Sequence, residues 1–70
     1  MRDGFTAVVQ RSGEWWIGWI AEIPGVNAQE ATRDQLLASL ASALDEALEM
    51  NRAEARSSAT GTYEEVPIPV

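Results

Sequence analysis

The residues best suited to chemistry in this sequence are four carboxylates, Glu14, Glu22, Asp45 and Glu46. Carboxylates that converge on rigid elements can hold a metal ion for metal-dependent hydrolysis. Of these four residues, only Glu22 falls in a segment that we expect to be a strand. We therefore interpret all four as solvated surface side chains, and we expect no catalytic site and no bound metal.

Other catalytic arrangements lack an essential partner. The chain has several serines but no histidine and no lysine to activate them as nucleophiles. Because the chain has neither cysteine nor histidine, it cannot form metal sites with thiolate or imidazole ligands. Gly13, Gly18 and Gly25 lie in a turn, a strand and a strand end, and do not form a phosphate-binding loop. We expect no cofactor and no enzymatic activity.

The tryptophans are the remaining candidates for function. Aromatic side chains can stack on nucleic-acid bases, but such sites need a basic groove beside them, and here the nearby charged residues include glutamates. We expect Trp16 to pack in the core. A small sheet covered by one helix cannot bury both of its faces, and exposed aromatic residues are typical of protein interfaces. We therefore predict a partner-binding face made of Trp15, Ile17 and Trp19.

The composition narrows the kinds of partner. The 70 residues indicate a single domain, 1–70, and the formal net charge is −6. All five basic residues are dispersed arginines, which disfavours direct binding to nucleic acid and suits a basic protein partner. No apolar run is long enough to cross a membrane and no leader is evident, so we expect a cytoplasmic protein. A chain this small buries a limited core, which favours a homo-oligomer.

The elements that position these residues begin with a central strand in Trp15 to Gly25, closed by a Pro-Gly turn. Gly4 to Gln10 is a second strand, joined to the first by a turn at residues 11–14. We expect Gln10 to pair with Trp15, which places Ala7 opposite Gly18. One hairpin face then holds a shallow trough where a helix can approach the backbone closely. The other face carries the following residues: Thr6, Val8, Gln10, Trp15, Ile17, Trp19 and Ala21.

The rest of the chain supplies a third strand, one helix and a final strand. Val26 to Ala31 is expected to form a short, irregular strand. Thr32 and Gln35 fit a capping box at the start of a helix whose apolar stripe is Leu36, Leu37, Leu40, Leu44, Ala47 and Leu48. We expect this helix to end between Ala53 and Arg56.

Tyr63 to Val70 is expected to be an edge strand or a tail laid on a partner, because Pro67 and Pro69 remove hydrogen-bond donors from one side. The predicted fold is α+β, in the order β-β-β-α-β, with one helix on one face of a small antiparallel sheet.

These features resemble the HicB antitoxin family. The similarity lies in the first strand, Phe5 to Val9, in the segment from Trp16 to Gly25 with its Glu-Ile-Pro-Gly turn, and in the polar run that ends at Thr32 before an Ala/Leu-rich helix. The resemblance covers about positions 4 to 70. It implies a partial ribonuclease-H-like domain without catalytic activity, usually dimeric or tetrameric, which binds and blocks HicA, a small basic ribonuclease toxin of bacteria. Many members also carry a C-terminal DNA-binding module, which we do not find here. A further departure is Val26, where the family often has cysteine.

Three functions follow as hypotheses. The first is an antitoxin that occludes a basic HicA-type ribonuclease with its aromatic face. The second is an orphan HicB-like domain that uses the face of Trp15, Ile17 and Trp19 only for self-association. The third is a magnesium-dependent nuclease that would lose activity in Glu22→Gln.

Overall fold

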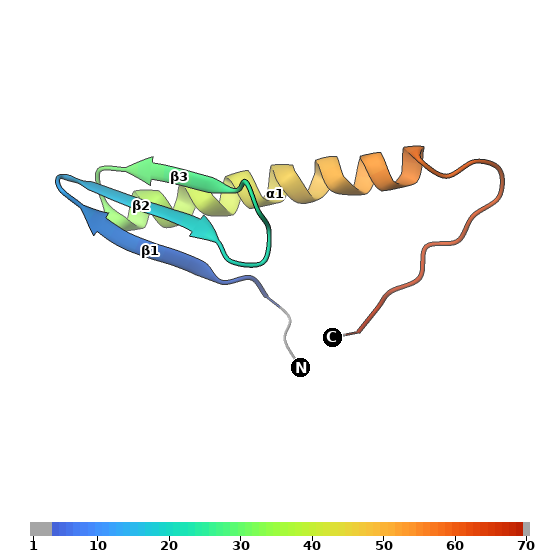
Figure 1. The fold of residues 1–70 in the computed structure, drawn as a ribbon, viewed down its shortest axis with the longest axis horizontal. Helices are drawn as coiled ribbons and strands as arrows, with labels where there is room; N and C mark the ends of the chain where they lie inside the picture. Colours follow the sequence, from blue (N-terminus) through green and yellow to red (C-terminus); the bar gives the residue numbers. More distant parts are fainter. Residues whose placement is uncertain (1–3, 70) are drawn as a thin grey trace.

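The computed structural model describes residues 4–69 and contains a three-stranded antiparallel sheet with one long helix (Figure 1). The strands are β1 (Ala7–Ser12), β2 (Trp15–Ile20) and β3 (Asn27–Glu30), and the helix is α1 (Arg33–Ser57). The sheet has the order β1-β2-β3, so the tryptophan-rich strand is central, as expected. The α+β fold class is confirmed, together with the packing of one helix against one face of the sheet.

The hairpin register differs from the predicted one by two residues. Gln10 pairs with Ile17, not with Trp15, and Ser12 pairs with Trp15. The reason is that Gly13 and Glu14 alone form the turn: Gly13 has φ 61°, while no described residue other than glycine has a positive φ. A positive φ at only the first central residue is the type II′ pattern, which suits the twist of a two-residue hairpin. A shift of two keeps every side chain on its predicted face.

Gly18 is a point where α1 packs closely on the sheet. Its neighbour across the hairpin is Val9, whereas the sequence predicted Ala7, which in fact pairs with Ile20. A Cβ atom placed on Gly18 would lie 3.1 Å from Leu40 Cδ1 and 2.9 Å from the main-chain oxygen of Val8. The predicted trough is therefore present on the face that α1 covers, although a different residue lies opposite the glycine.

The core lies between this face and the first half of α1. Its buried residues are Ile20, Val26, Leu36 and Leu40. Half-buried apolar side chains surround them, and Trp16 is among these, as predicted: Val9, Trp16, Ile23, Ala28, Ala43, Leu44 and Ala47. Strand β3 is shorter than expected and begins after Val26, whose side chain is buried and whose carbonyl accepts a hydrogen bond from the N–H of Ile20 at 3.0 Å.

Helix α1 begins at the predicted cap. The Thr32 Oγ1 accepts a hydrogen bond from the main-chain N–H of Gln35 at 3.1 Å, and Asp34 in the first turn suits the positive end of the helix dipole. The helix ends at Ser57, one residue beyond the predicted range, and the Glu54 carbonyl accepts hydrogen bonds from the hydroxyls of Ser57 and Ser58. The second half of α1 extends past the sheet (Figure 1).

Replacing the cap should weaken the fold measurably. For Thr32→Ala we expect the free energy of unfolding to fall by about 1 kcal/mol, because the N–H of Gln35 loses its side-chain acceptor. Thr32→Ser keeps a hydroxyl at the same place and should behave almost like the natural chain. Urea denaturation of both variants measures the difference, and equal losses in the two would contradict the capping role.

The predicted final strand does not form. Residues 59–69 make no strand pairing and follow α1 as an extended tail that turns back beneath the helix (Figure 1). Val70 lies outside the described residues. The order along residues 4–69 is therefore β-β-β-α, and the prediction of a fourth strand within the chain's own sheet is wrong for them. The alternating prolines leave only one side of the tail able to pair, and a single chain does not bring a sheet edge to that side.

Candidate functional site

The face of the sheet opposite α1 is not covered by any described residue. Alternation along the strands and the observed register bring together the side chains that we call the open face: Val8, Gln10, Ser12, Trp15, Ile17, Trp19, Asn27 and Gln29. The three predicted partner-binding residues, Trp15, Ile17 and Trp19, form its middle row, along the central strand β2. The structure therefore places all three predicted residues on one surface.

The middle row is large and accessible. The exposed fractions of Trp15 and Trp19 are 48% and 41%, whereas Ile17 between them is half-buried. Val8 pairs with Trp19 and is also exposed. An isolated exposed apolar residue is ordinary, but adjacent indoles and β-branched side chains on one flat surface are typical of a binding site.

Three residues of the open face were not predicted from the sequence: Ser12, which was expected in the turn, Asn27 and Gln29. Asn27 pairs with Trp19, and Gln29 pairs with Ile17, so each lies beside the middle row. With Gln10 on the other side, Ile17 lies between two amide side chains. The side chain of Ala28 packs toward the core, so alternation along β3 places Asn27 and Gln29 on the open face. The sequence could have predicted this if the register of β3 had been known.

No residue of the open face carries an ionisable group, although the chain is acidic. Glu14 lies in the turn at one end of β2, and Glu22 follows the strand at the other end. The Glu22 Oε1 accepts a hydrogen bond from the main-chain N–H of Thr6 at 2.8 Å. Arg11 lies on the opposite face, where its guanidinium carbon is 5.8 Å from the centre of the Trp16 ring. The open face thus has a neutral aromatic centre, and Glu14 and Glu22 lie just beyond the two ends of β2.

The four candidate carboxylates do not converge. Glu14 and Glu22 lie at opposite ends of β2, while Asp45 and Glu46 are exposed residues of α1. Across residues 4–69, no three acidic side chains come together in an arrangement that could hold a metal ion. Within the same residues, no helix is long and apolar enough to cross a membrane.

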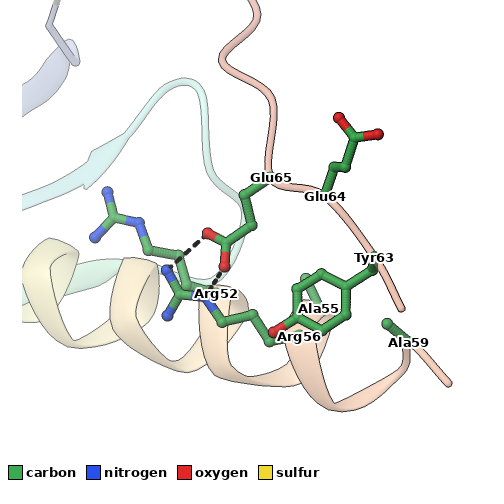
Figure 2. A pocket seen from close by; sticks show the side chains of 7 residues that line it. All are labelled: Arg52, Ala55, Arg56, Ala59, Tyr63, Glu64 and Glu65. Atoms are coloured by element: carbon green, nitrogen blue, oxygen red, sulfur yellow. Dashed lines mark hydrogen bonds and ion pairs between the residues drawn. The ribbon is translucent and has the colours of Figure 1, made fainter. Parts of the chain in front are cut away.

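A concave surface lies at the end of α1, where the tail turns back. It has a volume of about 260 Å³, and two arginines, Arg52 and Arg56, line it together with Tyr63 and Glu65 (Figure 2). The Nε and Nη2 atoms of Arg56 donate to the two carboxylate oxygens of Glu65 at 3.2 Å each. These hydrogen bonds and the attraction to Glu65 raise the pKa of Arg56. The contact between Arg56 and Glu65 thus holds the tail against the helix. All the residues that line this pocket are exposed, and its arginines and glutamates have opposite charges, so the pocket offers no distinct ligand chemistry.

Comparisons of the chain with protein-family models, with curated proteins and with solved structures found no match.

Proposed function

We propose that this chain is a non-catalytic protein-interaction module of the HicB-like antitoxin type, which binds a small basic ribonuclease of the HicA type in the bacterial cytoplasm. In this proposal the open face covers the active surface of the ribonuclease and keeps RNA from reaching it. No cofactor, metal or nucleic acid takes part. The observation that carries the proposal is the row of Trp15, Ile17 and Trp19 on a sheet face that α1 leaves uncovered.

The distribution of charge supports a basic partner. The chain has a formal net charge of −6, so its field attracts a basic protein and speeds the encounter. The centre of the open face is uncharged, so a partner can cover it and exclude water without burying an unpaired carboxylate. Glu14, in the turn before β2, can meet a basic side chain at the rim of the interface.

A variant of the open face tests the proposal. For Trp19→Asp we expect the dissociation constant for a HicA-type ribonuclease from the same genome to rise about 30-fold or more, because buried tryptophans at the centre of an interface commonly dominate its affinity. Because Trp19 contacts solvent on the open face, the variant should remain folded. Isothermal titration calorimetry measures the affinity, and circular dichroism checks the fold.

The matched control is Met50→Asp, which adds the same charge at an exposed position on the second half of α1. It should bind like the natural chain. The absence of any complex at micromolar concentrations, or equal affinity for the natural chain and Trp19→Asp, would contradict the proposal.

The neutrality of the open face also favours a second candidate function. Two copies of an acidic chain can bring uncharged faces together without placing like charges in the contact. In this alternative the open face serves only self-association, in a dimer or a tetramer. Trp19→Asp would then convert the oligomer into monomers, and no basic ribonuclease would bind the natural chain. Sedimentation equilibrium of the natural chain and the variant separates the two functions.

A further inference from the structure

The outer edge of β1 has main-chain hydrogen-bonding groups that no strand within residues 4–69 uses. β1 pairs only with β2 in the described sheet. The N–H of Ala21 donates to the carbonyl of Thr6 at 2.9 Å, which sets the alternation along β1. The main-chain groups of Val8, Gln10 and Ser12 therefore point toward β2. Those that point outward belong to Ala7, Val9 and Arg11.

The tail carries a complementary pattern. Val66 and Ile68 are 64% and 78% exposed, and they alternate with Pro67 and Pro69. Because proline has no N–H, only the side toward which Val66 and Ile68 direct their N–H groups can donate to a neighbouring strand. The tail can thus complete the edge of a sheet, but a further strand cannot add to its other side. Unpaired edges are sites of association, and proline is one of the residues that limit it.

The tail cannot use the edge of its own β1 while it is held to α1. Ala47 is the last residue of α1 packed against the core, and Arg56 lies nine residues further on, or about 14 Å along the helix axis. Arg56 holds Glu65 through two hydrogen bonds. The four described residues after Glu65 span at most about 14 Å. They can therefore reach the near end of the sheet but cannot run along β1.

We propose that the tail of one copy adds as an antiparallel fourth strand to the outer edge of β1 in a second copy, and that the second copy does the same in return. α1 starts at the hairpin-turn end of the sheet, directly after β3, and ends beyond the opposite end (Figure 1). When a two-fold axis relates two antiparallel chains, the C-terminal end of α1 in each chain lies at the hairpin turn of the other chain. From there the tail runs from Arg11 toward Ala7, which is antiparallel to β1.

The donors and acceptors select one register. With Val66 opposite Arg11 and Ile68 opposite Val9, each pair can exchange two main-chain hydrogen bonds. Paired residues share a face of the sheet, so Val66 and Ile68 join Val9 on the side that α1 covers. Pro67 then points to the open-face side.

Charge favours a second copy as the source of the added strand. Glu64 lies two residues before Val66, so in this register it is a diagonal neighbour of Arg11 on the same face. Within the described residues, the guanidinium of Arg11 donates to the Gly13 carbonyl at 3.1 Å and lies over Trp16, but it makes no ion pair with a carboxylate. The chain thus supplies both the basic group on the receiving edge and the acidic group on the added strand.

The first test is the oligomeric state of the full chain and of Ile68→Asp. We expect the natural chain to dimerise, and the variant to raise the dimer dissociation constant at least about tenfold, because an aspartate replaces an apolar side chain on the covered side. Thr62→Asp adds the same charge at an exposed loop position before the paired segment and should leave the dimer unchanged. Sedimentation equilibrium measures all three. A natural chain that stays monomeric up to millimolar concentration would overturn the proposal, as would a dimer that Ile68→Asp does not weaken.

The second test is a disulfide between the two strands. The proposed register places Gln10 opposite Pro67 in a non-hydrogen-bonded pair, with Cα atoms about 4.5 Å apart, which a disulfide can span. Since the natural chain has no cysteine, Gln10→Cys with Pro67→Cys should give a covalent dimer under oxidising conditions. Gln10→Cys with Thr62→Cys is the matched control and should give none.

The products distinguish the possible arrangements. A non-reducing gel and a mass spectrum separate a dimer from a monomer closed on itself. A closed monomer would show that the tail pairs within its own chain, and would overturn the proposal. A dimer that Trp19→Asp dissolves and Ile68→Asp leaves intact would assign association to the open face instead, and would overturn it as well.

Discussion

Leu40→Ala is expected to leave this chain with little or no stable folded state at 25 °C. Leu40 is almost completely buried and belongs to the core, and its Cδ1 atom lies close to Gly18 of β2. Removing a buried leucine side chain costs about 2–5 kcal/mol, since the lost contacts leave a cavity. A folded domain has roughly 0.05–0.15 kcal/mol of stability per residue, so the loss is a large part of the total for a chain of this length.

Urea denaturation followed by tryptophan fluorescence measures this loss, because the half-buried Trp16 reports on the core. The control is Met50→Ala, which removes a long apolar side chain from an exposed position on the same helix. It should change the free energy of unfolding by about 0.5 kcal/mol or less. If both variants lost the same stability, the contact of α1 with the sheet would not be the main stabilising interaction of the fold.

Gly18→Val is expected to be the second most damaging substitution. A Cβ atom at this position meets Leu40 Cδ1 and Val9 Cγ1 at 3.1 Å each and the main-chain oxygen of Val8 at 2.9 Å. The main chain of a strand cannot shift without distorting the strand pairing. Either α1 or β1 therefore has to move to make room for the added side chain. Overpacking of this kind costs about 1–3 kcal/mol, and the two extra methyl groups of valine make the upper part of that range the expectation.

The series Gly18→Ala and Gly18→Val separates the effect of the first carbon from that of the branched side chain. Gly4→Ala is the matched control, because a Cβ atom there meets nothing within 4 Å. We expect the midpoint of urea denaturation to fall in the order Gly4→Ala, Gly18→Ala, Gly18→Val. Strand propensity alone predicts the opposite, because valine favours strands more than glycine does. A stabilised Gly18→Val would show that the helix does not pack closely over Gly18.

Most of the fold could be predicted from local patterns in the sequence. The run of indoles and β-branched residues before Pro24 predicted the central strand, and the spacing of Leu36, Leu40 and Leu44 predicted the face of α1 that packs on it. Such signals succeed because alternation and helical periodicity depend on a few neighbouring residues. The cap at Thr32 is local in the same sense, and its hydrogen bond to Gln35 is present.

The two errors have different causes. The register of the hairpin depends on whether the turn takes two or four residues, and residues 11–14 are compatible with both. The tail has the alternation of a strand, but a strand needs an edge to pair with, and the chain's own β1 is out of reach of Val66 and Ile68 while Arg56 holds Glu65. The first error was a choice between two turns of different length, whereas the second depended on a partner strand that no short window of sequence encodes.

By itself, then, the sequence determined the strand and helix types, the core side of α1 and the two sets of side chains on the hairpin faces, because these follow from periodicity. The tertiary structure alone decided which of the two faces α1 covers, and hence that Trp15 and Trp19 remain exposed. The physical reason is close packing: the helix lies where Gly18 lets its side chains reach the sheet, and the face without such a site is left open.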